Sequence, residues 1–242
     1  MKNNNMIKFI LFDLDGTLLP MEQDKFIQIY LGLLAKKANS YGYDPDRLVK
    51  TIWAGTSNMV LNDGKMTNED VFWNTFVSEY GIEVLKDKYI FDNYYYNEFQ
   101  QLKGACGFNK ESKLVVDKLK NLGYKLVLAT NPLFPAIATE SRIRWAGLDP
   151  NDFQLYTTYE NSHHCKPNLE YYNDILEKLE CDAHECLMVG NDVDEDMIVA
   201  KIGMKTFLLT DCLINKNNVS IKNFTKGSFK DLLIYIDSLN EK

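Results

Sequence analysis

The feature that most constrains the fold of this chain is the stretch IKFILFDLDGTLL, residues 7–19. A short continuous apolar run closed by turn residues is typical of a buried strand in a parallel sheet. The run ends in Asp13 and Asp15, two carboxylates that repel each other, and a Gly-Thr pair follows at once. Ligands of open parallel sheets bind beyond the carboxyl ends of the strands. The stretch therefore predicts a buried first strand with a functional site at its end.

Further apolar runs alternate with helical patterns along the rest of the chain. Helical spacing of apolar residues predicts helices over 109–122, 135–146 and 169–179, and a last one from Phe229 to Leu239. Strands alternating with helices imply βαβ units. We therefore expect an α/β fold with a mainly parallel sheet that helices cover on both faces. The predicted strands are residues 8–12, 125–129, 153–157, 186–189 and 205–209.

One interval, residues 20–103, has helical patterns and no convincing strand. Asp44 before Pro45 and Thr67 before an apolar stripe are typical helix starts. We expect a separate helical domain here, inserted after the first strand of a core formed by residues 1–19 and 104–242. The hinges are predicted near 19–21 and 103–107.

Composition excludes several classes of function. The 242 residues are 45% hydrophobic and 25% charged, and the net charge of −7 argues against a nucleic-acid surface. No apolar stretch reaches the roughly 20 residues that span a bilayer, and no apolar leader precedes the first strand. The five cysteines form no CxxC pair, which is typical of reduced thiols. We expect a cytoplasmic protein without nucleic-acid or membrane partners.

The predicted strands end in polar residues that complement one another. Carboxylates at two strand ends suit a hard cation with oxygen ligands, most simply Mg²⁺, and an aspartate can also accept a phosphoryl group. A hydroxyl, backbone N–H groups near Leu14 and an ammonium would hold phosphoryl oxygens and offset their charge. The strand-end residues are Asp13 and Asp15, Thr130 and Asn131, Lys166 in the loop after the third strand, and Asn191 and Asp192 with Asp196 beyond them.

The segments DLDGT, LATN, CKP and VGNDVDED occur in the order and roughly the spacing of the four motifs of the haloacid dehalogenase (HAD) superfamily. The resemblance covers essentially the whole chain, and FDLDGTL is its most specific part. The helical insert resembles the cap domain of the subfamily I members. The resemblance implies a Rossmann-like core, Mg²⁺ as cofactor and hydrolysis of a small phosphorylated metabolite through an aspartyl-phosphate.

The resemblance also implies roles for single residues. Asp13 matches the nucleophile and Asp15 matches the general acid and base, while Thr130 and Lys166 match the phosphate-binding pair. A positioned acid contributes about 10²–10⁴-fold in rate. Dehalogenases of the superfamily lack the second aspartate and its ion pumps carry Lys there, so DLD favours a phosphatase or a phosphomutase.

The last motif departs from the family pattern, which begins Gly-Asp. This chain has Gly190, Asn191 and Asp192, so either Asn191 or Asp192 is expected to be the metal ligand with Asp13 and Asp15. Asp196 matches the second acidic position, where it would orient Lys166 or a metal-bound water.

Three alternatives to a phosphatase stay open at this point. A sugar phosphomutase would use the same chemistry, and a degenerate relative would only bind phosphate. A signalling receiver would be about half as long, without a helical insert or a use for Asp15.

Other features have plainer interpretations. His163, His164 and Cys165 are expected to be loop residues, because adjacent side chains rarely converge on one ion. Tyr94, Tyr95 and Tyr96 are expected to form part of the core of the helical insert. The segment Trp53 to Asp63 is expected to be a loop and a source of specificity residues.

Overall fold

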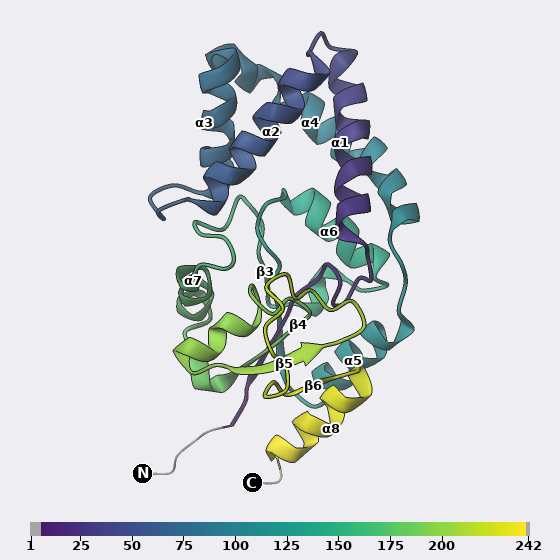
Figure 1. Ribbon diagram of the computed structural model, residues 1–242, viewed down its shortest axis with the longest axis vertical. Coiled ribbons are helices and arrows are strands. Elements are labelled where there is room, and N and C mark those ends of the chain that lie inside the picture. Colours follow the sequence, from purple (N-terminus) through teal and green to yellow (C-terminus); the bar gives the residue numbers. More distant parts are fainter. Residues whose placement is uncertain (1–5, 241–242) are drawn as a thin grey trace.

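The computed structural model describes residues 6–240. It has two parts stacked along the long axis of the molecule (Figure 1). Helices α1 to α4 form the upper part, which we call the cap, and the sheet with the remaining helices forms the core below it.

The core contains one six-stranded sheet in which all neighbouring strands run parallel, in the order β3-β2-β1-β4-β5-β6. The first strand lies in the middle, where Phe9 is aligned with Lys125 on one side and Cys186 on the other. The predicted parallel α/β fold is thus confirmed. The strands are β1 Phe9–Phe12, β2 Lys125–Leu128, β3 Leu155–Tyr156, β4 Cys186–Gly190, β5 Lys205–Leu209 and β6 Lys226–Gly227.

Two details of the predicted strands were wrong. The strand expected over 153–157 is only two residues long, because a short 3-10 helix, η3 (Pro150–Asp152), ends directly before it and Phe153 still forms the C-cap of that helix. The edge strand β6 was not predicted, since two residues carry no alternating pattern.

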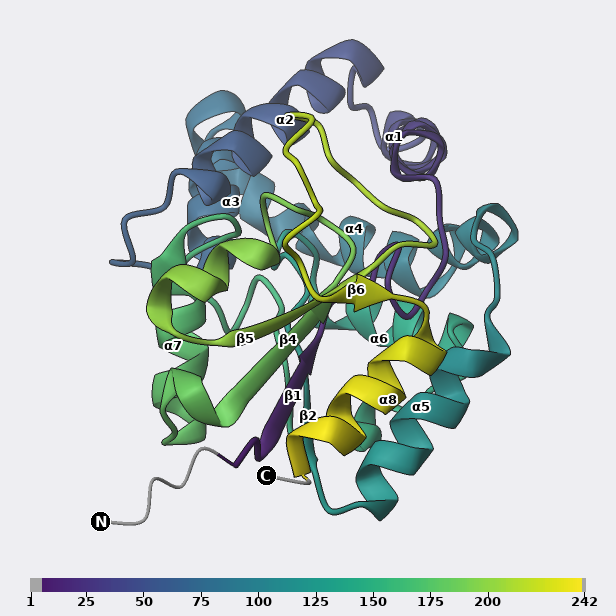
Figure 2. The same ribbon diagram turned by 60° about the horizontal axis from the view of Figure 1, so that its bottom comes forward.

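Helices cover both faces of the sheet, as Figure 2 shows for α7 on one side and α5 and α8 on the other. Successive side chains of a strand point to opposite faces. Ile10 and Phe12 accordingly pack with α5, α6 and α8, while Phe9 and Leu11 pack with α7 and η5. The helices of the core are α5 Lys110–Asn121, α6 Ala136–Trp145, α7 Leu169–Leu179 and α8 Phe229–Asn240, and two short 3-10 helices follow η3, namely η4 Ala183–Glu185 and η5 Met197–Ile202.

The regular elements of the cap are helices joined by turns. Asp44 accepts a hydrogen bond from the Arg47 amide and Thr67 accepts one from the Asp70 amide, so both predicted caps begin helices. The expected loop from Trp53 was wrong in its first part, because the helix that starts at Pro45 continues to Val60. The cap elements are α1 Gln23–Asn39, α2 Pro45–Val60, α3 Asn68–Tyr80, η1 Ile82–Asp87, α4 Lys88–Tyr96 and η2 Glu98–Ala105.

The chain enters and leaves the cap at neighbouring positions. Met21 and Cys106 form an antiparallel bridge, and the Gly107 amide donates a hydrogen bond of 2.7 Å to the Pro20 carbonyl. These positions coincide with the sequence ranges in which hinges were predicted. The division into two domains stays a prediction.

Aromatic rings join the cap to the core around Phe99. This fully buried ring lies edge-on to Phe26 of α1 and is stacked on Trp145 of α6, with ring centroids 5.2 Å apart in the latter pair. Tyr94 and Tyr95 are buried beside it, as expected for cap core, whereas Tyr96 is 71% exposed. Within residues 6–240, none of the helices has the length and apolar character that crossing a bilayer requires.

We expect Phe99→Ala to lower the free energy of unfolding by about 3–5 kcal/mol, because the cavity it leaves lies between packed rings from both parts. Tyr96→Ala is the matched control, and its exposed ring should change the value by no more than about 0.5 kcal/mol. Urea unfolding followed by circular dichroism measures both. Equal losses for the two variants would contradict the packing described here.

Candidate active site

Side chains that follow β1, β2 and β4 meet in a small cavity of about 40 Å³ at the carboxyl edge of the sheet. Parallel neighbours end at the same edge, so residues far apart in sequence are brought together there. Most of the predicted site residues are among them. The cavity is lined by Asp13, Asp15, Gln23, Thr130, Asn131, Asn191, Asp192, Glu195 and Asp196.

Lys166 lies behind the cavity and joins two of its carboxylates. Its ammonium donates to Asp13 Oδ1 at 3.0 Å and to Asp196 Oδ1 at 2.6 Å, and its side chain is 1% exposed. Burial works to lower the pKa of Lys166, but Asp13 and Asp196 more than offset this and raise the pKa well above its ordinary value. Burial also raises the pKa of Asp196, against the opposing effect of Lys166. The geometry makes Lys166 a fixed cation between two acids.

The end of β2 is held in place by two side-chain hydroxyls that donate to one of its backbone carbonyls. The carbonyl of Thr130 accepts hydrogen bonds from the hydroxyls of Thr157 and Tyr171, at 2.6 and 2.9 Å. Thr130 itself is buried and lines the cavity. Asn131 donates from its amide to Glu195 Oε2 at 3.2 Å, and its buried Oδ1 has no partner among the described residues.

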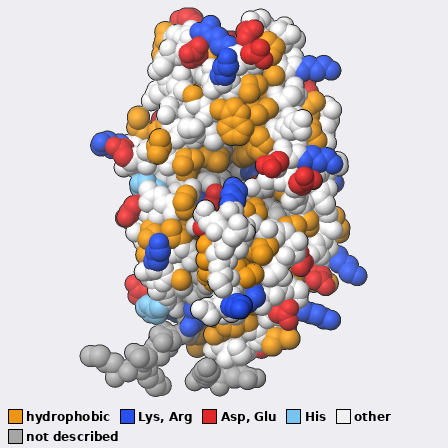
Figure 3. All heavy atoms as spheres, in the orientation of Figure 1, with side chains coloured by type: hydrophobic (Ala, Val, Ile, Leu, Met, Phe, Trp, Pro, Cys, Tyr) orange, Lys and Arg blue, Asp and Glu red, His pale blue; other side chains and the backbone are white. Residues whose placement is uncertain are grey.

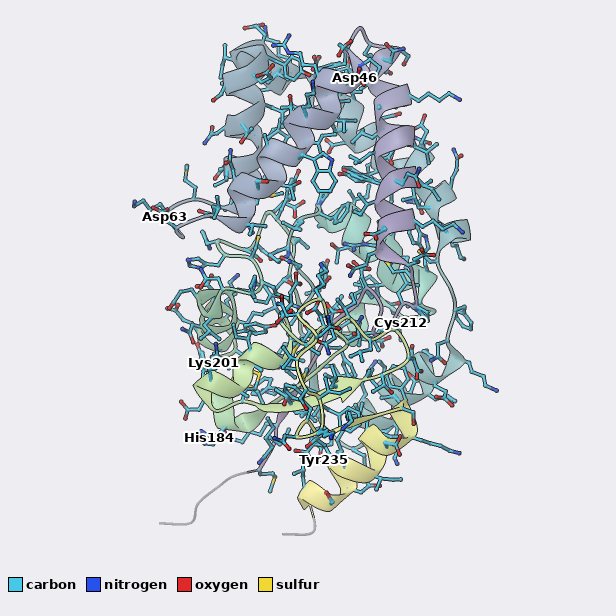
Figure 4. All side chains as sticks on the ribbon, viewed as in Figure 1. Asp46, Asp63, His184, Lys201, Cys212 and Tyr235 are labelled. Atoms are coloured by element: carbon cyan, nitrogen blue, oxygen red, sulfur yellow. The ribbon has the colours of Figure 1, made fainter. Side chains whose placement is uncertain are left out.

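The two candidate metal ligands in the last motif differ in the hydrogen bonds that their side chains already make. Asn191 accepts from the Thr17 hydroxyl at 2.8 Å and donates to the Cys212 carbonyl at 2.7 Å, so both ends of its amide are engaged. Figure 4 labels Cys212 on the loop below the start of α1. Asp192 accepts two backbone N–H bonds at Oδ1, whereas its Oδ2 has no hydrogen bond within the described residues. Only Asp192 therefore has a fully free oxygen.

A tight turn after β1 leaves backbone donors beside Asp13. Gly16 adopts a φ of +86°, which favours glycine, and a Cβ there would collide with the Asn191 amide. The amides of Leu14 and Asp15 have no acceptor within residues 6–240. N–H groups arranged in this way suit an anion.

Sequence reasoning missed Arg142. Its guanidinium, fully buried on α6, forms an ion pair with Asp15 Oδ2 and lies over the Phe134 ring, 4.5 Å from its centroid. The other oxygen, Asp15 Oδ1, is buried without a partner among the described residues. Burial raises the pKa of Asp15, and Arg142 acts in the opposite direction. The available signal was an arginine on the inner face of a predicted helix, which alone indicates no particular partner.

Negative charge dominates the cavity. Five carboxylates line it, and the cations that contact them are Lys166 and Arg142. A phosphate group would add further negative charge, so a divalent cation fits the charge balance. Among the described residues, no three His, Cys, Asp or Glu side chains are arranged as metal ligands. Mg²⁺ needs only one or two protein carboxylates because it keeps several waters, and Asp13 with Asp192 would meet that need.

A family model described as haloacid dehalogenase-like hydrolase matches residues 7–202, which is most of the chain. The chain belongs to this family. The predicted membership of the superfamily and the prediction of an enzyme are thereby confirmed. No curated protein matches the chain.

Solved structures of HAD proteins share the fold. A HAD phosphatase from Thermococcus onnurineus is 19% identical with a TM-score of 0.57, over 95% of this chain and 98% of that one. A predicted phosphoglycolate phosphatase from Haemophilus somnus has the same identity of 19% and TM-score of 0.57, over 95% and 97% of the two chains. The HAD-hydrolase YfnB from Bacillus subtilis, bound to magnesium, is 20% identical with a TM-score of 0.56, over 96% and 99%.

The histidine pair lies outside this site. His164 lies in the loop before α7, and its Nδ1 is 2.8 Å from Oδ2 of Asp174 within that helix. Neither His163 nor His164 lines the cavity. The pair was expected to be loop residues, and the structure places it in a loop.

We expect Arg142→Met to lower the free energy of unfolding by about 3 kcal/mol, since it leaves a buried carboxylate without its partner. Arg144→Met is the matched control on the same helix, because Arg144 pairs with Glu140 at the surface and such pairs contribute about 0–1 kcal/mol. Adding Asp15→Asn to Arg142→Met should recover part of the loss. Additive losses in this double-mutant cycle, measured by urea unfolding, would show that the two side chains do not interact.

Proposed function

We propose that this HAD hydrolase is a Mg²⁺-dependent phosphatase that hydrolyses small phosphorylated metabolites through an aspartyl-phosphate on Asp13. The observation that carries the proposal is the pairing of each aspartate of the first motif with its own buried cation. Lys166 binds Oδ1 of Asp13, and Arg142 binds Oδ2 of Asp15. One oxygen of each carboxyl group is left for the reaction.

Asp13 Oδ2 is the atom placed to attack phosphorus, since Oδ1 already accepts from Lys166. As the new O–P bond forms, the bond from phosphorus to the substrate oxygen breaks. The leaving oxygen takes a proton from Asp15 Oδ1, the buried oxygen without a partner. The raised pKa of Asp15, caused by burial, favours the protonated form that this step needs.

The second step uses the same groups in reverse. Water attacks the phosphorus atom of the aspartyl-phosphate and gives its proton to Asp15, and Asp13 leaves as a carboxylate. Arg142 keeps the Asp15 carboxyl in one orientation through both steps, so the proton is removed and returned at the same atom.

Phosphoryl oxygens would be held by groups of this chain around Asp13. The Thr130 hydroxyl and the amides of Leu14 and Asn131 are candidates, because the structure leaves them without acceptors within the described residues. Lys166 offsets negative charge from beneath, and Asp196 holds Lys166 in place at 2.6 Å. Such fixed donors stabilise developing charge without having to reorganise.

Asp13 and Asp192 would hold the Mg²⁺ ion, with the backbone near Asp15 as a further oxygen donor. When bound, the ion would offset the charge of the transferring phosphoryl group. Asn191 is better suited to a supporting role, since its amide joins the loop after β4 to Thr17 and Cys212.

The position of the cap supports the proposal that the substrate is small. It lies over the carboxyl edge of the sheet (Figure 1), where it limits access for folded proteins or nucleic acids. The net charge of −7 also repels polyanions. One neighbour of similar fold is described as a predicted phosphoglycolate phosphatase and another as bound to magnesium, which agrees with this class. Five thiols without a disulfide favour a cytoplasmic location.

The proposal is tested by phosphate release from a panel of alkyl phosphomonoesters with Mg²⁺ and with EDTA. We expect release with Mg²⁺ and almost none after chelation. A binding-only relative would release nothing under either condition, and a phosphomutase would need a bisphosphate for turnover.

We expect Asp13→Asn to abolish turnover, because an amide oxygen is a poor nucleophile. Asp15→Asn should lower kcat about 10²–10⁴-fold for an alkyl phosphate and much less for p-nitrophenyl phosphate, whose leaving group needs little protonation. Steady-state kinetics on both substrates measure the difference. If both substrates lose equally, Asp15 is not the acid of the first step.

We expect Asp192→Asn to raise the Mg²⁺ concentration for half-maximal activity while leaving thermal stability nearly unchanged. Asn191→Ala should lower thermal stability and leave the Mg²⁺ concentration for half-maximal activity nearly unchanged, because it removes two buried hydrogen bonds of about 1 kcal/mol each. Mg²⁺ titration of activity and thermal unfolding distinguish the two. A larger Mg²⁺ effect at Asn191 would assign the ligand to that residue.

A further inference from the structure

A second, larger cavity lies between cap and core, and we call it the chamber. Its volume is about 310 Å³, within the range in which small organic ligands bind. The walls come from α1, α2, α3 and α4 of the cap, from residues 133–135 after β2, and from Lys216 on the loop between β5 and β6. Figure 2 shows this loop extending from the sheet toward α1 and α2.

The lining of the chamber is mostly apolar and aromatic. All but four of its lining residues are of this kind, and the four are Gln23, Thr56, Asp92 and Lys216. Figure 3 shows hydrophobic side chains gathered on this face of the cap, above the hollow between the two parts. The walls therefore favour a ligand that is itself largely apolar.

The chamber and the catalytic cavity adjoin at one residue. Gln23, the first residue of α1, lines both cavities. The side chain of Gln23 has no hydrogen-bond partner within the described part of the chain, and Gln23 stands two residues beyond the bridge at Met21. A substrate whose phosphate lies at Asp13 can thus extend its organic part past Gln23 into the chamber.

The hydroxyl groups in the walls offer little to a sugar. Tyr30 and Tyr95 share one hydrogen bond of 2.9 Å between their hydroxyls, so the hydroxyl that donates in this pair has already used its proton. Sugar hydroxyls would lose their water partners on entering an apolar wall, which is unfavourable unless they are replaced. A small carboxylate would also bind weakly in the chamber. The lining has one cation, Lys216, and one carboxylate, Asp92, so its net charge is zero.

Aromatic rings give the walls their shape. Trp53 projects from α2 into the lining and is 49% exposed, so part of its surface is uncovered. Phe72, Phe134 and Tyr159 contribute further rings from α3 and the core. Flat ring systems stack or pack edge-on against such side chains and gain about 0.5–1.5 kcal/mol per pair beyond the area that they bury.

We propose that the chamber binds the organic part of the substrate and selects phosphomonoesters whose alcohol carries a flat, largely apolar ring system, with Trp53 as a specificity-determining residue. The inference rests on the proposed phosphatase activity and adds the chemical class of its substrate.

The test compares two alkyl phosphates with similar leaving oxygens, 2-naphthylmethyl phosphate and 2-hydroxyethyl phosphate. Because both leave as primary alcohols, a difference in kcat/KM reports binding in the chamber and not reactivity. We expect kcat/KM to be at least about tenfold higher for the naphthylmethyl ester. In Trp53→Ala this ratio should fall about tenfold through a higher KM for the naphthylmethyl ester. Tyr89→Ala removes a 57% exposed cap ring that does not line the chamber, and it should leave the ratio unchanged.

Calorimetric titration of the Asp13→Asn chain with 2-naphthylmethyl phosphate separates the two proposals. If neither ester is hydrolysed by the unaltered chain but the naphthylmethyl ester binds more weakly to the Trp53→Ala chain, the phosphatase is overturned and the chamber is supported. If both esters are hydrolysed with equal kcat/KM, or if Trp53→Ala and Tyr89→Ala change the ratio equally, the chamber is overturned and the phosphatase stands.

Discussion

The whole site depends on the position of Lys166 between Asp13 and Asp196. Its ammonium joins the end of β1 to the segment after β4 from a loop that belongs to neither strand. A buried cation with two carboxylate partners is favourable only when all three are held in place, because each of them loses its water. The sheet provides this by ending β1 and β4 at the same edge. Fold and site share one requirement, since the interaction that neutralises the acids also fixes the position of Asp13.

A second buried cation gives the two aspartates of the first motif different partners. Asp13 and Asp15 are two residues apart, yet each has a different partner, Lys166 for one and Arg142 for the other. Their mutual repulsion is thus handled by two elements, the loop before α7 and the helix α6. The arrangement leaves one oxygen of each carboxyl group without a partner among the described residues, which is what the proposed phosphoryl transfer requires.

The strands and the residues that end them could be predicted because the same pattern, an apolar run followed by polar residues, repeats along the sequence. The apolar runs predicted four of the five expected strands closely, since buried strands have a plain pattern, and the strand-end positions of Asp13, Thr130 and Asn191 followed from them. The partner of Asp15 could not be predicted, because Arg142 lies 127 residues away and its role depends on tertiary packing. The engagement of Asn191 by Thr17 and Cys212 was hidden for the same reason. Trp53 was placed in a loop because no pattern marked how far α2 extends.

The paired crossing at Met21 and Cys106 has a consequence for how such a chain can change over evolutionary time. Because the insert begins and ends at adjacent points, its length and internal order do not affect the path of the core strands. The cap is an insert whose two ends meet, and the entropic cost of closing such an insert grows only slowly with its length. Substitutions in the walls of the chamber can therefore accumulate while Lys166 and its partners Asp13 and Asp196 stay unchanged. One catalytic core can in this way acquire new substrates by exchanging what lies between two hydrogen-bonded residues.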